Sequence, residues 1–419
     1  MTTIAYIANR LPSPVEPYVL DEIEELRGRG VRVVCCSGRR ASRDDLSHRE
    51  VRFLEEAFVF YPPSPARAIE GLQCLLSNSD LMKKLLRVAP TEDKVTISQR
   101  FRFLGHTVLG AALAKTLLPF RVDHIHAHHG YFASSMAMVA AAILEAGFSF
   151  TLHGSDLLLG KGALLGTKLE SCRFCVTVSE FNRHFLLNKY PHIPESKVLV
   201  APLGVDPATV VQIGRSESRS RKLHILSVGR LHAVKNYRFL IDACDKLRKQ
   251  GIDFECRIAG DGPEHRALER QVRRLRLENT VFLLGHVPRA SLARYYRDAD
   301  LFVLTSNSEG VPVTLMEAMS NGTIVLAPAI TGIPELVIHG RTGFLYKAGS
   351  MVDFMNSARW ILDRANSLSE VRRAAVQHIA EFYDRRKNLF SFTNQFLSRI
   401  HRYEESHAHS LLQQVQLQV

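Results

Sequence analysis

The segment LFVLTSNSEGVPVTLMEAMSNGTIVLAP (301–328) holds one complete strand–helix–strand unit. Its two ends, LFVLTS (301–306) and TIVLAP (323–328), are short apolar runs bounded by turn residues, which is typical of buried strands. Between them, VTLMEAMS (313–320) is helical in composition, and Asn321-Gly322 ends the helix. Two parallel strands joined through a helix form a right-handed βαβ unit, so this segment predicts an α/β fold.

The same alternation recurs along the whole chain. In the first half we predict strands at 3–8, 31–37, 123–129, 148–154, 174–179 and 197–204, with helices at 17–30, at 132–146 and from Glu180. In the second half we predict further strands at 224–230, 254–260 and 281–287, and a helical region at 351–403. We therefore expect two Rossmann-like domains with parallel sheets that face a central cleft.

A change of composition near the middle of the chain predicts the domain boundaries. Residues 206–222, DPATVVQIGRSESRSRK, become polar and charged and are interpreted as a linker. This linker separates an N-terminal domain (1–205) from a C-terminal domain (223–385). We expect residues 386–419 to form a helix that packs back on the N-terminal domain, followed by a polar tail that frays after Tyr403.

The composition fits a protein of the reducing cytosol. The chain has 419 residues and is 46% hydrophobic, which is enough for two buried cores. Its first residues, MTTIAYIANRLP, carry a polar loop where a secretory signal would have an apolar stretch. The seven cysteines are an odd number, and the lone CxxC of Cys172 and Cys175 is interpreted as buried thiols rather than a metal or redox pair.

The two most apolar stretches are predicted to be packed helices rather than membrane spans. FASSMAMVAAAIL (132–144) is shorter than the roughly 20 residues that a span needs. FLGHTVLGAALAKTLLPF (103–120) is interrupted by His106 and Lys115.

The formal net charge of +12 allows nucleic acid, anionic lipid or phosphorylated metabolites as partners. The basic residues are scattered, with one denser strip at RQVRRLR (270–276) that we interpret as a solvated helix face. No nucleic-acid-binding signature accompanies the strip, so a nucleic-acid partner is not expected.

Charged residues follow the predicted strands of the second half, where parallel sheets bind their ligands. SVGRLHAVKN (227–236) places Gly229, Arg230 and Lys235 just past a strand, and two cations after a glycine turn suit a diphosphate. AGDGPE (259–264) follows the next strand, and Gly260 and Gly262 would let the backbone approach a ligand. Alone this glycine pattern is weak, because such turns are also common for steric reasons.

Two glutamates flank the start of the helix predicted at 313–320. The unpaired N–H groups there form a seat for a phosphate, with Glu309 before the helix and Glu317 more than one turn into it. A sugar nucleotide carries hydroxyl groups on both sides of its diphosphate, so Glu309 could bind the sugar and Glu317 the ribose. The alternative is that Glu317 is merely solvated and Glu309 assists the helix cap, and spacing alone supports both equally.

The ordered motifs resemble a known family. SVGRL with its following lysine, AGDGP, SEGVPVTLMEAM, TGIPELV and GRTGFLY resemble the C-terminal domain of retaining glycosyltransferases of family 4, also called glycosyl transferases group 1. In the N-terminal half, DHIHAHHGYFASSMA, FTLHGSD and VTVSEFNRHFL are similar to the branch that builds bacterial exopolysaccharides of the colanic-acid type. The resemblance implies a GT-B fold, with the acceptor on the N-terminal side and the nucleotide-sugar donor on the C-terminal side.

The resemblance also implies roles for individual residues. The catalytic residues would be His153, which faces the donor, and Glu309, which contacts the donor sugar. Donor binding is assigned to Gly229, Arg230, Lys235, Gly260, Gly262, Gly310, Val311, Pro312 and Glu317. His126, His128 and Asp156 are expected on the acceptor side. Glu16 in VEPY takes the place of an acid that this branch usually has in an S-E-T-F segment, and its role is open.

The histidines of HIHAHH raise the alternative of a metal site. Alternate side chains share one strand face, so His124, His126 and His128 would line up. No further ligand set clearly completes such a site in the sequence, so no metal is expected. The family resemblance suggests a front-face retaining reaction without a cofactor, in which the leaving phosphate helps to deprotonate the acceptor. Glu309 as a nucleophile is the less favoured route.

The expected function is transfer of a sugar from a UDP- or GDP-sugar, as co-substrate, to a glycan or lipid-linked acceptor in surface polysaccharide synthesis. Two alternatives remain: a nucleotide-sugar epimerase of the same fold, and an inert subunit that binds a partner glycosyltransferase. The expected location is cytoplasmic and peripheral at the inner face of the membrane, because each basic residue near anionic lipid contributes about 1 kcal/mol.

Overall fold

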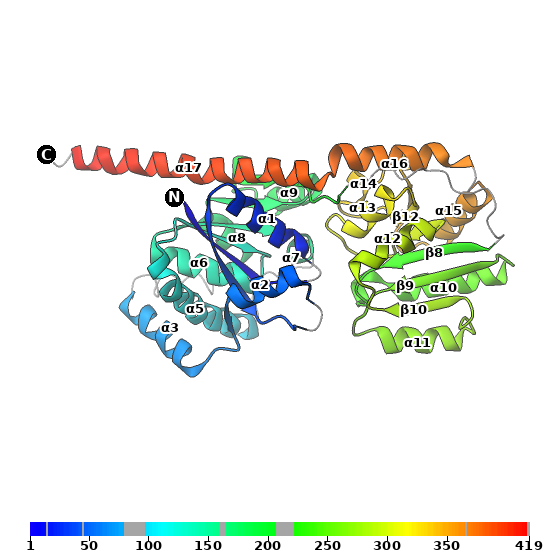
Figure 1. Ribbon diagram of the computed structural model, residues 1–419, viewed down its shortest axis with the longest axis horizontal. Helices are drawn as coiled ribbons and strands as arrows, with labels where there is room; N and C mark the ends of the chain where they lie inside the picture. The colour runs from blue at the N-terminus through cyan, green and yellow to red at the C-terminus, as the bar shows by residue number, and fades with distance from the viewer. Residues whose placement is uncertain are drawn as a thin grey trace. The chain divides into compact units, whose positions relative to one another are not determined.

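The computed structural model describes residues 1–13, 16–43, 46–78, 97–158, 164–206, 222–364 and 367–416. The chain forms two compact units. In Figure 1 the N-terminal unit is coloured blue to green and includes the red helix near the C-terminus, and the C-terminal unit is coloured green to orange. The N-terminal unit comprises Met1–Val178, Asn182–Ala201 and Leu389–Val419, and the C-terminal unit comprises Ser179–Phe181 and Pro202–Asn388. Of the predicted linker, residues 207–221 lie outside the described residues.

The N-terminal unit is built on a seven-stranded sheet in the order β3-β2-β1-β4-β5-β6-β7. All its strand pairs are parallel. Its strands are β1 (Thr3–Arg10), β2 (Arg32–Arg39), β3 (Phe58–Tyr61), β4 (His124–His128), β5 (Gly147–Leu152), β6 (Phe174–Thr177) and β7 (Val198–Val200). The strand order changes direction between β1 and β4, which makes the carboxyl ends of these two strands a topological switch point.

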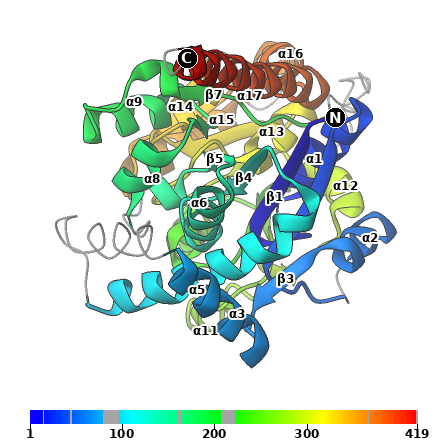
Figure 2. The ribbon, with the colours of Figure 1, turned by 90° about the vertical axis from the view of Figure 1, so that its left-hand side faces the viewer.

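Helices cover both faces of this sheet (Figure 2). They are α1 (Pro17–Gly28), α2 (His48–Glu56), α3 (Pro65–Ser77), α5 (Ile97–Leu117), α6 (Phe132–Leu144), α7 (Ser155–Leu158), α8 (Leu165–Ser171) and α9 (Glu180–Lys189). Two short 3-10 helices, Leu118–Phe120 and Glu195–Lys197, also lie in this unit. Side chains of α5, α6 and α8 pack on one face, and those of α1 and α17 (Arg385–Gln416) pack on the other.

Local sequence explains several helix starts in this unit. Pro17 and Pro65 stand in the first turn of α1 and α3, where the missing backbone N–H removes no hydrogen bond. Helix α2 begins with a capping box in which Ser47 accepts from the backbone of Glu50 and the Glu50 side chain accepts in return.

The apolar helix α5 is packed inside the unit, as predicted. Its segment Arg102–Phe120 is long and apolar enough to cross a membrane by length and composition alone, and half of it is buried in the unit. Helix α6 lies so close to it that a Cβ on Gly110 would come within 2.7 Å of Val139 Cβ. A contact this close leaves no room for a side chain at position 110.

The C-terminal unit has a six-stranded sheet in the order β10-β9-β8-β11-β12-β13, again with parallel pairs. Its strands are β8 (Leu223–Val228), β9 (Phe254–Ala259), β10 (Val281–Gly285), β11 (Leu301–Val303), β12 (Ile324–Pro328) and β13 (Phe344–Tyr346). The order changes direction between β8 and β11, which defines a second switch point.

The helices of this unit begin with a 3-10 turn, Ala233–Lys235. The α-helices are α10 (Tyr237–Lys249), α11 (His265–Arg274), α12 (Arg289–Asp298), α13 (Val313–Ser320), α14 (Ile333–Leu336), α15 (Met351–Asp363) and α16 (Ser369–Phe382). The basic strip predicted as a solvated face lies on and just after α11, and its Arg270, Arg273, Arg274 and Arg276 are exposed.

Two expectations about elements need correction. Strands β3 and β13 were not predicted, because FVFY and FLY are too short to show a periodic pattern. The chain was expected to fray after Tyr403, but α17 continues to Gln416. No Gly or Pro interrupts this helix, so nothing in the local sequence stops it.

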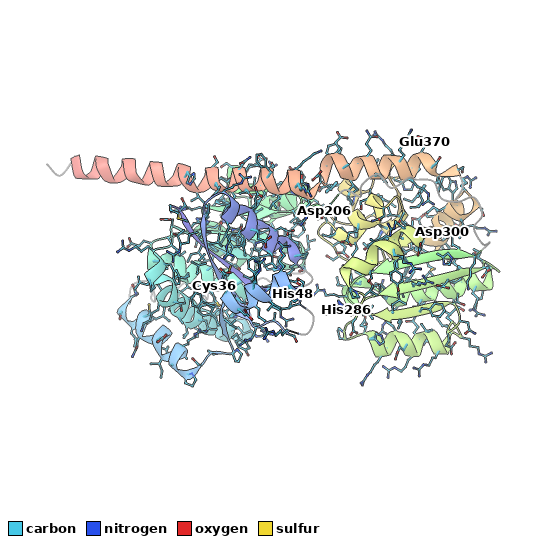
Figure 3. The ribbon with its side chains drawn as sticks, in the orientation of Figure 1. Cys36, His48, Asp206, His286, Asp300 and Glu370 are labelled. Carbon is cyan, nitrogen blue, oxygen red and sulfur yellow. The ribbon has the colours of Figure 1, made fainter. Side chains whose placement is uncertain are left out.

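The cysteines are free thiols in this structure, and six of the seven are buried, including Cys172, Cys175 and the Cys36 labelled in Figure 3. Burial raises the pKa of Cys172 to about 12 and that of Cys175 well above its ordinary value. Buried, protonated thiols are poor metal ligands and poor nucleophiles.

Candidate active site

Two loops meet at the switch point of the C-terminal sheet: residues 229–236 after β8 and residues 304–312 after β11. Backbone and side-chain hydrogen bonds join them, from Asn307 N to Val234 O (2.8 Å) and from the Thr305 hydroxyl to Lys235 O (3.0 Å). The loops therefore form one surface from segments about 70 residues apart in the sequence.

Lys235 and Glu309 form an ion pair across these loops. The distance from Lys235 Nζ to Glu309 Oε1 is 2.6 Å, and Ser306 Oγ donates to the same oxygen at 2.5 Å. The two side chains are 18% and 11% exposed, so a ligand at the surface could reach both. An anionic phosphate that approached Lys235 would compete with this carboxylate.

Arg230 adds a second cation to the same loop. Its side chain is exposed, and within the described ranges it has no ion pair or side-chain hydrogen bond. The predicted pair of cations thus lies at one edge of the sheet, with one cation held by Glu309 and the other available to bind oxygen atoms bidentately.

The glycines of these loops have a steric role in the fold. A Cβ on Gly260 would lie 1.9 Å from Gly229 O, and a Cβ on Gly262 would lie 2.5 Å from Leu231 O. The backbone of Leu231 in turn donates to Asp261 O at 2.9 Å. Close approach of the loops after β8 and β9 explains these glycines, and their contact with a ligand stays a prediction.

Helix α13 begins at Val313, as predicted, and Pro312 is its capping residue. The backbone N–H groups of Val313 and Thr314 have no hydrogen-bond partner in the described part of the chain. Val311 and Pro312 are buried, and Gly310 packs against the Gly332 backbone, so this turn has a fixed shape. The end of the helix is available to an anion.

Glu317 is half-buried and accepts a hydrogen bond from the Tyr296 hydroxyl at 2.8 Å. Glu309 bonds to Lys235 and Ser306 rather than to the end of α13. These contacts disfavour the alternative in which Glu317 is merely solvated and Glu309 assists the helix cap.

The three alternate histidines of β4 share one sheet face, as predicted, and pack near Tyr6 and Phe396. His126 and His128 are completely buried. Their expected position on an open acceptor surface is therefore wrong, because α1 and α17 cover this face of the sheet.

His126, His128 and Glu22 offer ligand atoms within 4.8 Å of one another, a separation that could suit a metal ion. However, both ring nitrogens of His126 already face hydroxyl groups, of Ser149 at 2.7 Å and of Thr151 at 3.0 Å. Both nitrogens of His128 are likewise engaged, at 3.0 Å from His153 and 3.2 Å from Glu22. A metal would have to replace these bonds, so the cluster is better described as a hydrogen-bond network.

At the switch point of the N-terminal sheet, His129 bridges two carboxylates. Its Nε2 lies 2.7 Å from Glu16 Oε1 and its Nδ1 lies 3.4 Å from Asp156 Oδ2. Burial disfavours the charged ring, but the hydrogen bonds and charges of Asp156 and Glu16 outweigh it and raise the pKa of His129 to about 10. His129 is therefore an imidazolium at neutral pH.

Asp156 shapes the surrounding loops. Its carboxylate accepts from the backbone of Gly130 at 2.9 Å and of Gly154 at 3.0 Å, and the residue is 1% exposed. The buried Lys168 ammonium holds the same turn by donating to Gly130 O at 2.8 Å. Asp156 is therefore buried beside His129, and its expected contact with an acceptor stays a prediction.

His153 is half-buried between the rings of Tyr18 and His129, with centroid distances of 4.8 and 4.7 Å. Burial, and next the charge of His129, hold the pKa of His153 well below its ordinary value. The ring is therefore neutral. Of these residues, Glu22 had no predicted role, and His129 had been considered only as part of the histidine cluster, although its place just past β4 was a usable signal.

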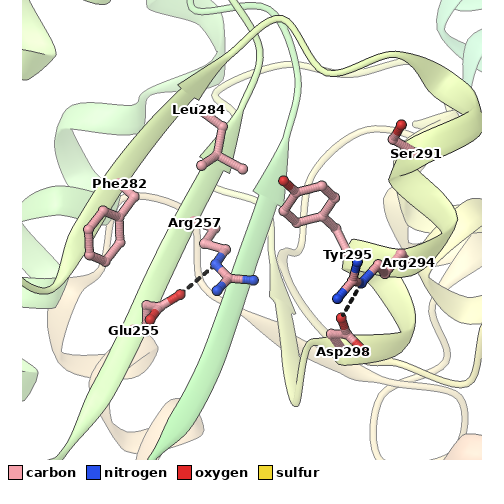
Figure 4. Close-up of a pocket in the computed structure, with 8 residues that line it drawn as sticks. All are labelled: Glu255, Arg257, Phe282, Leu284, Ser291, Arg294, Tyr295 and Asp298. Carbon is pink, nitrogen blue, oxygen red and sulfur yellow. Dashed lines mark ion pairs between the residues drawn. The ribbon is translucent and has the colours of Figure 1, made fainter.

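A groove of about 800 Å³ lies elsewhere, along the β9–β10 edge of the C-terminal sheet (Figure 4). It is lined by Glu255, Arg257, Phe282, Leu284, Ser291, Arg294, Tyr295 and Asp298. Its charges pair with one another, with Arg257 Nε at 2.5 Å from Glu255 and Arg294 Nε at 3.5 Å from Asp298. The groove contains none of the predicted site residues.

Two Rossmann-like units of this kind define the GT-B class of glycosyltransferase folds. The structure of HepE from Anabaena in complex with UDP is 19% identical, has a TM-score of 0.69, and covers 95% of this chain and 100% of its own. The structure of the lipopolysaccharide outer core galactosyltransferase WaaB is also 19% identical, has a TM-score of 0.68, and covers 95% of this chain and 100% of its own. At these identities the likeness concerns the fold.

Residues 15–209 match the model of Glycosyltransferase Family 4, and residues 212–378 match that of Glycosyl transferases group 1. The two matches follow one another along the chain, so the chain is similar to glycosyltransferases over most of its length.

Among its relatives, the putative colanic acid biosynthesis glycosyltransferase WcaL of Salmonella typhimurium is 37% identical over 57% of this chain and 61% of its own length. The amylovoran biosynthesis glycosyltransferase AmsK of Erwinia amylovora is 31% identical over 58% of this chain and 62% of its own length. The chain thus spans about three-fifths of these relatives.

Proposed function

We propose that this protein is a retaining glycosyltransferase that moves a sugar from a nucleotide-diphosphate donor to a glycan or lipid-linked acceptor in bacterial exopolysaccharide synthesis. The observation that carries the proposal is the convergence of Arg230, Lys235, Glu309 and the open end of α13 at one switch point. Relatives named for colanic acid and amylovoran synthesis support the acceptor class. A solved structure with UDP in the same fold supports a nucleotide donor.

The donor's diphosphate would bind to Arg230, Lys235 and the first N–H groups of α13. These positive groups would neutralise the charge that develops on the leaving nucleoside diphosphate, without a metal ion. The turn of Gly310, Val311 and Pro312 would contact the donor sugar next to Glu309. Gly229, Gly260 and Gly262 would allow the neighbouring loops to pack close to the sugar. Glu317, fixed by Tyr296, would accept from the ribose hydroxyl groups.

The reaction would follow a front-face route, in which the leaving phosphate oxygen takes the proton of the attacking acceptor hydroxyl. Departure of the phosphate and attack from the same face retain the anomeric configuration. Glu309 would then stabilise the donor sugar through hydrogen bonds, because its carboxylate is already held by Lys235 and Ser306. His153, neutral in this structure, would bind a hydroxyl group of the donor sugar.

Thermal unfolding with UDP, GDP, ADP and their sugars tests the donor site. A nucleotide at about 100 times its dissociation constant stabilises the fold by roughly 2.7 kcal/mol, which raises the Tm by several degrees. We expect this shift for one base, and we expect Lys235→Ala to abolish it. Lys246→Ala, which removes an exposed lysine of α10, is the matched control and should keep the shift.

No shift with any of these ligands would contradict the donor site and favour an inert subunit. If the shift occurs, incubation with the matching sugar nucleotide in tritiated water separates the remaining alternatives. Tritium in the recovered sugar would indicate an epimerase, whereas release of the nucleoside diphosphate with an acceptor present indicates transfer.

We also propose that the protein works in the cytoplasm, at the inner surface of the membrane. Helix α3 exposes Ile69, Leu72 and Leu76, which are 55%, 50% and 68% accessible and share one helical stripe. Together with the net charge of +12, this stripe fits an anionic bilayer surface. In low salt we expect sedimentation with anionic but not with neutral liposomes, and at least tenfold weaker binding after Leu72→Glu. Equal sedimentation with anionic and with neutral liposomes would contradict the proposal.

A further inference from the structure

A line of hydrogen bonds crosses the interior of the N-terminal unit and ends at His153. The Tyr6 hydroxyl donates to Glu22 Oε2 at 3.0 Å, and His128 Nε2 lies 3.2 Å from the same oxygen. On its other side, His128 Nδ1 lies 3.0 Å from His153 Nε2. Tyr6 and His128 are fully buried and Glu22 nearly so, which isolates the line from water.

The protons along this line can be assigned from the chemistry of its members. A carboxylate only accepts, so His128 carries a proton on Nε2, facing Glu22. In the neutral form of His128 this is the only proton on the ring. A neutral ring has one N–H, so His128 Nδ1 is an acceptor and His153 Nε2 must be the donor to it.

We propose that Glu22 and His128 are positioning residues that fix His153 as its Nε2–H tautomer. In that tautomer His153 Nδ1 holds a lone pair and can only accept a hydrogen bond. Within the described ranges this nitrogen has no partner and is covered by protein atoms, so a ligand would reach it only where neighbouring side chains make room. Resting on the proposed function, we assign this ligand group as a hydroxyl of the donor sugar.

The surroundings of His153 support this assignment. The charged His129 ring lies 4.7 Å away and opposes a second proton on His153. A hydroxyl group can rotate to donate to Nδ1, and its oxygen then remains available to other donors. The opposite tautomer would place an N–H at Nδ1, and His153 would then donate the hydrogen bond instead of accepting it. Glu22, a carboxylate on α1, thus controls which hydrogen bond His153 makes with its substrate.

Nuclear magnetic resonance of the full chain labelled with ¹⁵N-histidine tests the assignment directly, without substrate. Long-range proton–nitrogen correlations distinguish a protonated from an unprotonated ring nitrogen, and His153→Gln assigns the signal. We expect His153 of the wild type to be protonated on Nε2 alone. A proton on Nδ1, or on both nitrogens, would overturn the proposal whatever the variants show.

Two substitutions of His128 form a matched pair. The side-chain oxygen in His128→Asn can replace Nδ1 as the acceptor, whereas His128→Leu offers none. We expect the Nε2–H tautomer of His153 in His128→Asn and a mixture of tautomers in His128→Leu and in Glu22→Met. An unchanged tautomer in both His128→Leu and Glu22→Met would overturn the positioning role.

Sugar transfer provides the second readout. We expect at least a tenfold loss of kcat/KM in His128→Leu and recovery to within about threefold of the wild type in His128→Asn. Equal losses in both variants would show that His128 acts only as packing, which overturns the proposal. If NMR shows the predicted tautomers but no sugar nucleotide is turned over, the positioning role is supported and the proposed function is contradicted.

Discussion

His129 shows how one side chain at a strand end acquires chemistry that its residue type alone does not imply. It lies just past β4 with φ at 72°, between Glu16 and Asp156. Two carboxylates hold its proton even though the ring is buried. Burial, and next the charge of this cation, lower the pKa of His153, so the charges at this switch point depend on how these side chains are packed together.

Because the pKa of His129 is raised on folding, its stabilising effect should be complete below about pH 6.5 and vanish as the pH rises through about 10. We expect His129→Asn, which tolerates the left-handed backbone, to lower the free energy of unfolding by urea on the order of 3 kcal/mol near pH 6. The difference from the wild type should shrink toward pH 10. The control is His232→Asn at an exposed histidine, and a difference independent of pH would contradict the assignment.

The loops after β8 and β9 illustrate how neighbouring strands constrain the segments that follow them. Their backbones approach so closely that Gly260, with φ at 143°, has no room for a side chain. This contact fixes the start of the loop that carries Arg230 and Lys235. The glycines of AGDGP therefore affect the donor site mainly by allowing the loops to pack closely together.

Gly260→Ala is expected to destabilise the protein by about 3 kcal/mol or more, because the new Cβ would clash with Gly229 O. Gly285→Ala is the matched control. Gly285 also has a positive φ, of 67°, but has nothing within 4 Å, so it should lose only about 1 kcal/mol. Urea unfolding of both variants measures the difference, and equal losses would show that backbone strain alone accounts for the glycine.

Among the described residues, partners far apart in sequence meet where α17 packs on the sheet of the N-terminal unit. Phe392, Phe396 and Ile400 are buried on the same face of the sheet as Tyr6 and Ile23. Phe396 contacts the rings of His126 and Phe174, with centroid distances of 5.0 and 5.5 Å. The last helix thus closes the core over the histidines of β4.

Phe396→Ala should cost about 3 to 5 kcal/mol of stability, because it leaves a cavity under α17. Phe390→Ala in the same helix should cost less than about 1 kcal/mol, since Phe390 is 59% exposed. Thermal and urea unfolding of the two variants provide the comparison. A cost for Phe396→Ala as small as for Phe390→Ala would mean that α17 does not contribute to this core.

Much of the fold and half of the candidate site could be predicted from local sequence. Strand and helix patterns are local, and parallel sheets place their ligands at strand ends, so Lys235 and Glu309 could each be placed at the ligand-binding edge of the sheet. Their ion pair at 2.6 Å was not predicted. The short strands β3 and β13 carried too few residues for a pattern and were missed.

The amino-acid order alone was enough for the two α/β units, the helix after SEGVP and the shared face of the β4 histidines, because each depends on residues a few positions apart. The tertiary structure alone decided which side chains are buried and what they bond to. It buried His126 and His128 under α17, paired Glu16 with His129, and aligned Glu22 with His128 and His153. Burial and proton positions depend on neighbours brought together from distant segments, and no local pattern encodes them.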